Sequence, residues 1–108
     1  MNWERLTDLQ QLEQITKASF QVPVLFFKHS TRCSISVMVL NRFEREWNNK
    51  SVNAYFLDLL KYREVSNQIA NIFEVEHHSP QILLIKDGIC VYHTSHNSIS
   101  AHVINDFC

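Results

Sequence analysis

Two short, nearly uninterrupted hydrophobic runs, each followed by a stretch of helical periodicity, place the strongest constraint on the fold of this 108-residue chain. The runs are Pro23–Lys28 and Val52–Leu59, and their length and composition are typical of strands buried on both faces. Strands that are separated by helices pair in parallel through right-handed crossover connections. The alternation therefore predicts a parallel pair of strands covered by helices.

The helices are predicted from hydrophobic residues that recur at three- and four-residue intervals. They form four groups: Leu9, Leu12 and Ile15 behind a capping box of Thr7 and Gln10; Ile35, Val39, Phe43 and Trp47; Val65, Ile69, Ile72 and Phe73; and Ile99, Val103 and Phe107 behind a cap at Ser98. Two further strands, Gln81–Ile85 and Ile89–His93, flank Lys86-Asp87-Gly88 and predict an antiparallel hairpin. The element order α-β-α-β-α-β-β-α predicts one α/β domain over residues 1–108, with a four-stranded mixed sheet and helices on both faces in the thioredoxin-like arrangement.

Composition and charge argue against several classes of protein. The net charge of −1 argues against a nucleic-acid-binding protein, and no hydrophobic run approaches the roughly 20 residues that cross a bilayer. The N-terminal stretch is charged and lacks the hydrophobic segment of a signal peptide. The three cysteines, Cys33, Cys90 and Cys108, are odd in number and widely spaced, so a secreted disulfide framework is not expected. We therefore expect a cytoplasmic protein with neither a membrane nor a nucleic-acid partner.

Cys33 lies where a buried strand is expected to end and a helix to begin. A thiolate at this position is stabilised by the free N–H groups and the dipole of the helix. The neighbouring side chains that could stabilise the thiolate or contact a substrate carry a positive charge or a hydroxyl group: Lys28, His29, Arg32, Ser30, Thr31, Ser34 and Ser36. The alternative is a buried, inert cysteine, but the polar residues on both sides favour a reactive thiol.

Ser36 stands where a redox dithiol would carry its second cysteine, so Cys33 has no local partner. Cys90 is expected just beyond the far turn of the hairpin, about 20 Å from the active end at roughly 3.3 Å per residue. Cys108, at the end of the last helix, is also expected to be distant, although a mobile C-terminal tail keeps it as an alternative partner. The sequence thus predicts a site with one cysteine, which can exchange a mixed disulfide but cannot close a local ring.

Ser79 and Pro80 immediately precede the strand that pairs antiparallel inside the predicted sheet. In thioredoxin-like folds the loop at this place carries a cis-proline that faces the active cysteine. The backbone of the residue before that proline pairs with an extended thiol substrate. We therefore expect Ser79 and Pro80 to form a cis-proline loop beside Cys33.

Three stretches of the chain, FKHSTRCSIS, VSNQIANIFEVEHHSPQ and SHNSIS, resemble the monothiol bacilliredoxins, the YtxJ-like branch of the thioredoxin superfamily. The likeness extends over nearly the whole chain. The thiol motif of that family is usually Thr-Cys-Pro-Ile-Ser. In this chain Arg32 precedes the cysteine and Ser34 replaces the proline, which shapes the first turn of the helix but is not the nucleophile.

The resemblance implies a monothiol thiol-disulfide oxidoreductase that acts in cell redox homeostasis and the stress response. Cys33 would attack the mixed disulfide between bacillithiol and a client protein, free the client thiol and carry bacillithiol until a second thiol removes it. Bacillithiol would be the thiol co-substrate and S-bacillithiolated proteins the partners, with no bound cofactor.

Two other functions are compatible with a single cysteine in this setting. One is a monothiol glutaredoxin-like iron–sulfur carrier, although the Gly-Phe turn that follows the cysteine in those proteins is absent. The other is a non-enzymatic thioredoxin-fold interaction module. A metal site is not expected, because the six histidines show neither Cys-x-x-Cys nor His-x-x-x-His spacing.

Overall fold

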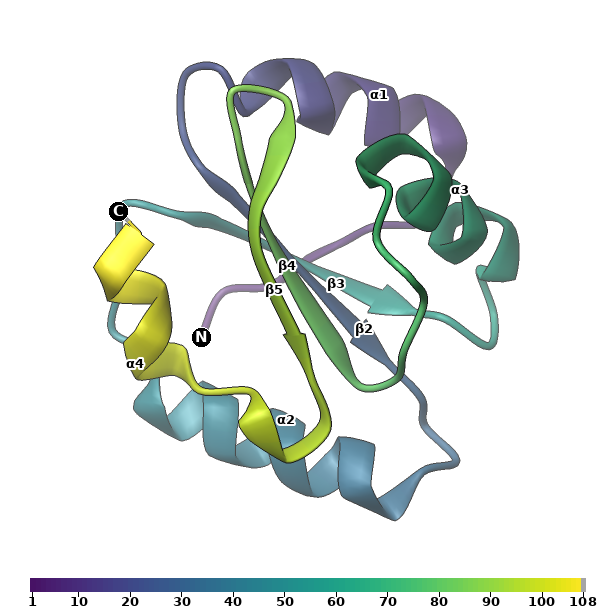
Figure 1. The fold of residues 1–108 in the computed structure, drawn as a ribbon. Coiled ribbons are helices and arrows are strands. Elements are labelled where there is room, and N and C mark those ends of the chain that lie inside the picture. The colour runs from purple at the N-terminus through teal and green to yellow at the C-terminus, as the bar shows by residue number, and fades with distance from the viewer. Residues whose placement is uncertain (108) are drawn as a thin grey trace.

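The computed structural model describes residues 1–107 and contains one five-stranded sheet with helices on both faces (Figure 1). The strands are β1 (Glu4–Arg5), β2 (Val24–His29), β3 (Asn53–Asp58), β4 (Gln81–Lys86) and β5 (Ile89–Ser95). The helices are α1 (Leu9–Ala18), α2 (Ser34–Glu46), α3 (Arg63–Phe73) and α4 (Ala101–Ile104), with 3-10 turns at His96–Ser98 and Asn105–Phe107. None of the helices among the described residues has both the length and the hydrophobicity needed to cross a membrane.

The strands lie in the order β1-β3-β2-β4-β5. β3 is parallel to both β1 and β2, whereas β4 is antiparallel to β2 and to β5. Helices α1 and α3 cover one face of the sheet, and α2 and α4 cover the other (Figure 1). The predicted α/β class and the mixed sheet with helices on both faces are confirmed.

The sheet has five strands where the sequence predicted four. The additional strand, β1, is only two residues long, and both of its residues are exposed. It pairs with β3 through the registers Glu4 to Tyr55 and Arg5 to Phe56. A two-residue strand with exposed, charged side chains carries no hydrophobic pattern, so it could not be predicted from the sequence.

Two predicted helix caps are wrong. Helix α1 is capped by Asp8, whose Oδ1 accepts a hydrogen bond from the Gln11 N–H at 2.7 Å, so the cap lies one residue after the predicted Thr7. The Gln11 side chain in turn accepts from the Thr7 N–H at 2.8 Å. Helix α4 begins after Ser100 and not after Ser98, which belongs to a 3-10 turn.

The central strand β2 divides the hydrophobic core, because its side chains alternate between the two faces. Val24 and Phe26 pack towards α1 and α3, while Leu25 and Phe27 pack towards α2 and α4. All six residues of β2 are buried, as the hydrophobic run predicted. Since Lys28 and His29 continue this alternation, their side chains lie on opposite faces of the sheet.

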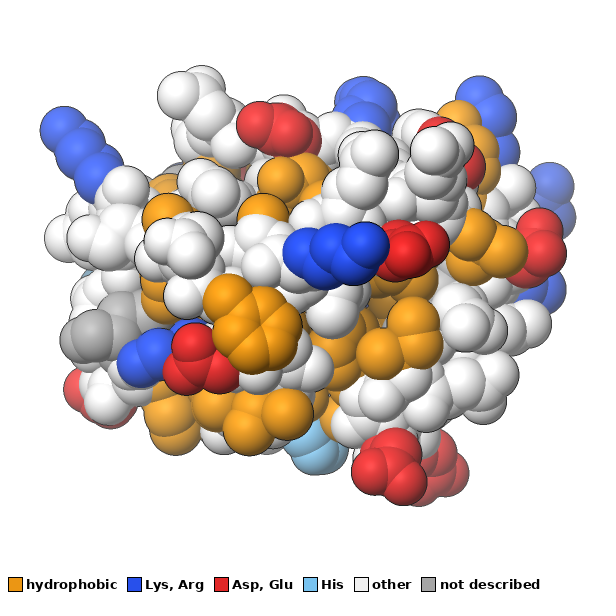
Figure 2. Space-filling model, turned by 90° about the horizontal axis from the view of Figure 1, so that it is seen from above, with side chains coloured by type: hydrophobic (Ala, Val, Ile, Leu, Met, Phe, Trp, Pro, Cys, Tyr) orange, Lys and Arg blue, Asp and Glu red, His pale blue; other side chains and the backbone are white. Residues whose placement is uncertain are grey.

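The predicted hydrophobic stripes are only partly buried. Val39 and Phe43 of α2 are fully buried, but Ile35 is 44% exposed because Ser36 takes the inward position in the first turn. Ile72 of α3 is 43% exposed. Figure 2, which looks onto the face that carries α1 and α3, shows hydrophobic side chains exposed between charged ones.

The hairpin between β4 and β5 is confirmed, with its turn at Asp87 and Gly88. Both residues have positive φ angles, 52° and 77°, as the tight turns of two-residue hairpins require. A Cβ atom at Gly88 would lie 2.9 Å from Cζ of Phe20, so a side chain here would strain the turn and displace the Phe20 ring.

Candidate active site

Cys33 is the residue immediately before helix α2, where the chain is still extended (φ −108°, ψ 117°). Its N–H donates to the Ser30 carbonyl at 3.2 Å, and its own carbonyl accepts the first hydrogen bond of the helix, from Val37, at 3.1 Å. The Cys33 side chain makes no capping hydrogen bond and is partly exposed. The thiol therefore lies at the positive end of the helix dipole, and the first-turn N–H groups are free to stabilise a thiolate.

Ser36 fixes the corner between β2 and α2. Its side chain is fully buried, and its Oγ lies 2.7 Å from Nδ1 of His29 and accepts a hydrogen bond from the Ser30 N–H at 3.2 Å. Residues three apart are neighbours on a helix, so Ser36 lies on the same side of the first turn as Cys33. The position that would hold a second thiol is thus occupied by a hydroxyl group with two hydrogen-bond partners.

His29 is buried on the α2 face of the sheet, with its ring 5.4 Å from the ring of Phe56. Burial lowers the pKa of His29 from its ordinary value of 6.5, against the opposing charges of Asp58 and Glu44. The imidazole is therefore neutral at pH 7, and its Nδ1 either accepts a hydrogen bond from the Ser36 hydroxyl or donates one to it, according to its tautomer.

The Lys28 side chain lies on the other face of the sheet, the face covered by α1 and α3. Its side chain is fully buried, and its Nζ donates to the Ser66 carbonyl of α3 at 3.0 Å and lies 3.2 Å from Nδ1 of His77. Burial lowers the pKa of Lys28 to about 8. Burial and the positive charge of Lys28 also lower the pKa of His77, which leaves its imidazole neutral and able to accept from the ammonium group. Lys28 thus contacts the loop that leads to Pro80, whereas His29 and Ser36 lie on the opposite face of the sheet.

The burial of Lys28 predicts an unusual dependence of stability on pH. The unfolded chain keeps the lysine proton up to about pH 10.5, whereas the folded protein releases it near pH 8. The unfolded state therefore binds more protons between these values, so the free energy of unfolding rises with pH over this interval. Relative to a Lys28→Met variant, we expect wild type to gain on the order of 3 kcal/mol from pH 8 to 10.5, measured by urea unfolding.

The matched control for this measurement is Lys17→Met, since the Lys17 side chain is 76% exposed. Wild type and the Lys17 variant should differ by a constant amount over the same pH range. A constant difference between wild type and Lys28→Met would show that Lys28 does not lose its proton early in the folded protein.

The loop before β4 reaches the same end of the sheet as the Cys33 corner (Figure 1). The Ser79–Pro80 peptide bond is cis, as expected. Pro80 is buried, and its carbonyl accepts from the His96 N–H at 3.0 Å. Gln81, the next residue, pairs with Lys28 at the end of β2. The Ser79 Oγ is buried and has no hydrogen-bond partner among the described residues.

The remaining predicted site residues surround the thiol on the surface. Thr31, Arg32 and Ser34 are exposed next to Cys33. Their roles in stabilising the thiolate or contacting a substrate stay predictions. The sequence did not reveal Ser66 and His77 as the partners of Lys28, although a lysine inside an otherwise hydrophobic strand indicates that a buried acceptor must exist.

Cys90 lies at the far end of the sheet from Cys33. It pairs with Ile85, and Ile85 pairs with Val24, the first residue of β2, while Cys33 follows the last. The five steps along the strand from Val24 to His29 span about 16 Å at roughly 3.3 Å per residue, well beyond disulfide reach. Burial raises the pKa of the Cys90 thiol, which donates to the Tyr92 carbonyl. The prediction for Cys108 falls outside the described residues.

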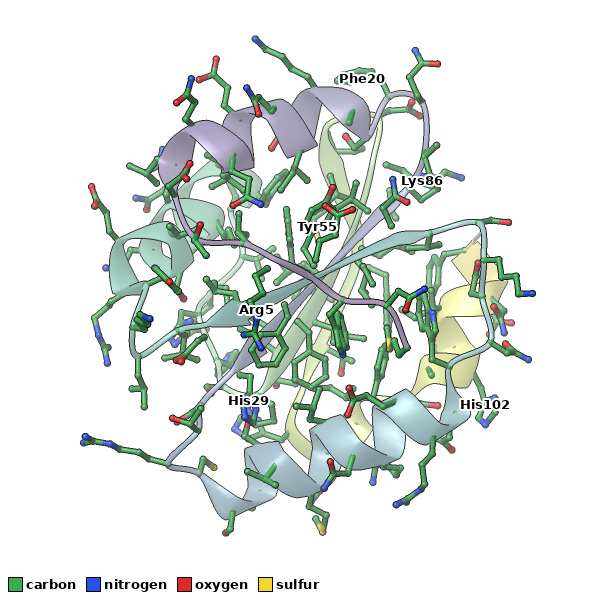
Figure 3. The ribbon with its side chains drawn as sticks, turned by 180° about the vertical axis from the view of Figure 1, so that it is seen from behind. Arg5, Phe20, His29, Tyr55, Lys86 and His102 are labelled. Carbon is green, nitrogen blue, oxygen red and sulfur yellow. The ribbon has the colours of Figure 1, made fainter. Side chains whose placement is uncertain are left out.

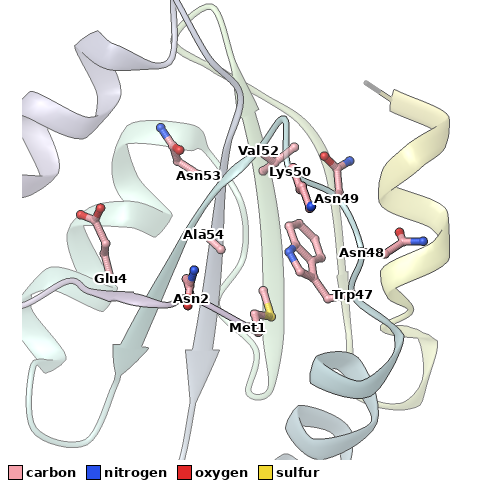
Figure 4. Close-up of a pocket in the computed structure, with 10 residues that line it drawn as sticks. All are labelled: Met1, Asn2, Glu4, Trp47, Asn48, Asn49, Lys50, Val52, Asn53 and Ala54. Carbon is pink, nitrogen blue, oxygen red and sulfur yellow. The ribbon is translucent and has the colours of Figure 1, made fainter.

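A pocket of about 500 Å³ also lies at that far end (Figure 4). It is lined by the start of β3, the segment after α2 and the N-terminal residues: Val52, Asn53, Ala54, Trp47, Asn48, Asn49, Lys50, Met1, Asn2 and Glu4. None of its lining residues belongs to the Cys33 corner. Among residues 1–107, no group of three or more His, Cys, Asp or Glu side chains is arranged to hold a metal ion.

Solved structures similar to this one share its fold. One, described as having a thioredoxin fold and provisionally as an oxidoreductase, is 26% identical, with a TM-score of 0.82 over 94% of this chain and 89% of that chain. The thioredoxin of Malassezia sympodialis is 14% identical, with a TM-score of 0.75 over 98% of this chain and 87% of its own. The thioredoxin of Fasciola hepatica is 16% identical, with a TM-score of 0.72 over 96% of this chain and 94% of its own. The predicted thioredoxin-like fold is confirmed.

The family comparison agrees with the single-cysteine site. Residues 4–104 match the family of the monothiol bacilliredoxin BrxC. The matched region contains Cys33, Ser36 and the cis-proline loop. The chain therefore belongs to the monothiol bacilliredoxin family of thioredoxin-fold thiol oxidoreductases.

Proposed function

We propose that this protein removes bacillithiol from S-bacillithiolated client proteins through a mixed disulfide on Cys33. One observation carries the proposal. The N-terminus of α2 holds one partly exposed thiol, Cys33, and the buried Ser36 stands in the place of a second thiol. Such a site can exchange a mixed disulfide, but it cannot resolve it internally.

The reaction is a thiol–disulfide exchange with no net oxidation. The Cys33 thiolate attacks the bacillithiol sulfur of the mixed disulfide, so that a bond between Cys33 and bacillithiol forms while the bond to the client sulfur breaks. The client leaves as a thiolate and takes up a proton from water. A second low-molecular-weight thiol then attacks the bacillithiol sulfur, which frees Cys33 and yields a low-molecular-weight disulfide.

The residues around Cys33 have separate roles in this proposal. Arg32 favours the thiolate by its charge, Thr31 and Ser34 contact the substrate, and the backbone of Ser79 pairs with the extended part of the client. Lys28 acts indirectly, since it contacts His77 in the loop that carries Pro80. Bacillithiol is a co-substrate in this scheme, the reaction needs no bound cofactor, and the protein works in a reducing cytoplasm in response to oxidative stress.

The test is to incubate the reduced protein with a bacillithiolated client and to measure the masses of both proteins over time. We expect the client to lose bacillithiol while Cys33 gains it, with the adduct located by peptide mapping. The matched substrate is the same client carrying glutathione. Transfer of glutathione without transfer of bacillithiol would assign the protein to glutaredoxin-type chemistry.

A further inference from the structure

A small pocket opens at the C-terminal end of β3, the strand that pairs with β2. Its volume is about 220 Å³, and it is lined by Arg5, Leu6, Phe56, Asp58, Lys61 and Tyr62. Two of these residues are cationic and one carries a carboxylate. Neither Arg5 nor Lys61 lies within 4.0 Å of a carboxylate oxygen among the described residues. The pocket therefore presents two cations with no protein counter-ion in contact.

Packed side chains link the pocket to the residues around the thiol, since Phe56 lines the pocket and packs against His29. Asp58 is paired with His29 across β3 and β2, and the rings of Phe56 and His29 are 5.4 Å apart. His29 contacts Ser36, which lies one helical turn from Cys33. Figure 3 shows Arg5 and His29 on the same side of the sheet, with His29 nearer to α2.

The two cations are held against aromatic rings. The Arg5 guanidinium lies 5.4 Å from the centre of the Phe56 ring, and Nζ of Lys61 lies 5.5 Å from the centre of the Tyr62 ring. Such contacts restrict a cation without neutralising its charge. The Asp58 Oδ1 accepts from the Lys61 N–H at 3.3 Å, which holds the loop that carries Lys61. Both cations are thus available to an anion that enters the pocket.

The charges follow a defined order outward from β2, the strand that leads to the thiol. Asp58 lies on β3, next to β2, and Arg5 lies on β1, one strand farther away. Neighbouring strands are roughly 4.8 Å apart, so Arg5 is about 10 Å across the sheet from β2. Consider a small thiol with an amine near its sulfur and carboxylates about 10 Å away, which is the length of three extended residues. Its charges would follow one another in the order in which Asp58 and Arg5 lie across the sheet.

We propose that the pocket binds the carboxylate-bearing end of the low-molecular-weight thiol whose sulfur reacts with Cys33. The inference rests on the proposed function and adds the place where the small thiol is recognised. Arg5 and Lys61 pair with the carboxylates, and Asp58 pairs with the amine. Reactive disulfides without carboxylates use Cys33 but not the pocket.

The test compares the rates at which the reduced protein reacts with three symmetrical disulfides: bacillithiol disulfide, glutathione disulfide and the neutral bis(2-hydroxyethyl) disulfide. The rate of adduct formation on Cys33 is followed by mass. In an Arg5→Gln/Lys61→Gln variant we expect the rate with bacillithiol disulfide to fall about tenfold, because two exposed ion pairs are lost. The rate with the neutral disulfide should stay unchanged.

The matched control is Arg45→Gln/Lys50→Gln, which removes the same charge from exposed positions at the other end of α2 and beyond it. This variant should react as wild type does with all three disulfides. An equal loss with the neutral disulfide, or no loss with bacillithiol disulfide, would overturn the role of the pocket. If wild type reacts with glutathione disulfide but not with bacillithiol disulfide, the proposed function fails instead, and the glutathione rates of the two variants then test the pocket.

Discussion

Replacing Cys33 by serine is expected to reduce thiol transfer from a bacillithiolated client to the background rate. The reason is positional: Cys90, the other described cysteine, lies at the opposite end of the sheet, and burial raises the pKa of its thiol. Serine preserves the shape of the residue before α2 but provides no nucleophile at neutral pH. The measurement is the mass of the protein after incubation with the bacillithiolated client.

Cys90→Ser is the matched control for this experiment, and it should transfer bacillithiol at the wild-type rate. Residual transfer by Cys33→Ser would place the nucleophile at another cysteine. A Cys33→Ala variant with full biological activity would show that the protein serves as a non-enzymatic interaction module, whatever its chemistry in vitro.

Replacing Ser36 by cysteine is expected to convert the one-thiol site into one that closes a ring. The introduced thiol lies three residues after Cys33 on the first turn of α2, where the two side chains are neighbours. After Cys33 has taken up bacillithiol, the introduced thiolate attacks the Cys33 sulfur, an intramolecular disulfide forms, and bacillithiol is released. Mass spectrometry without reductant should show a protein lighter by two hydrogen atoms in place of the bacillithiol adduct.

Ser34→Cys is the control for ring closure, because adjacent residues on a helix do not face each other. It should retain the bacillithiol adduct as wild type does. The Ser36 substitution also removes the hydroxyl that bonds His29 and the Ser30 N–H. We therefore expect the reduced variant to lose about 1–3 kcal/mol of unfolding free energy. A persistent bacillithiol adduct on the Ser36→Cys variant would show that the two thiols cannot meet. In wild type, an intramolecular disulfide through Cys33 would contradict the one-thiol mechanism.

Features whose physical cause lies within a few residues could be predicted from the sequence. The hydrophobic run of β2 predicts a strand buried on both faces, and all six of its residues are buried. The turn at Asp87 and Gly88 was predicted because few residues adopt positive φ angles. Strand β1 was missed, since its two exposed residues belong to the sheet only through hydrogen bonds to a distant strand.

Side-chain roles at the site were harder to predict than the elements that carry them. The sequence placed Lys28 with the basic residues around the thiol, although period-two alternation along β2 sends Lys28 and His29 to opposite faces. The packing of α3 and of the loop before Pro80 then decides that Lys28 contacts Ser66 and His77. Those partners are 38 and 49 residues away along the chain, so no local pattern could reveal them.

The sequence by itself determined the place of Cys33 between a buried strand and a helix, and the serine in place of a second cysteine three residues later, because each of these is a property of one short stretch. The tertiary structure decided which groups surround that stretch. It brings His29 into contact with Ser36, sets the loop of Pro80 beside the end of β2, and gathers Arg5 and Lys61 around one pocket. These contacts join residues from different strands, helices and loops, and only the packing of the helices on the sheet fixes their distances.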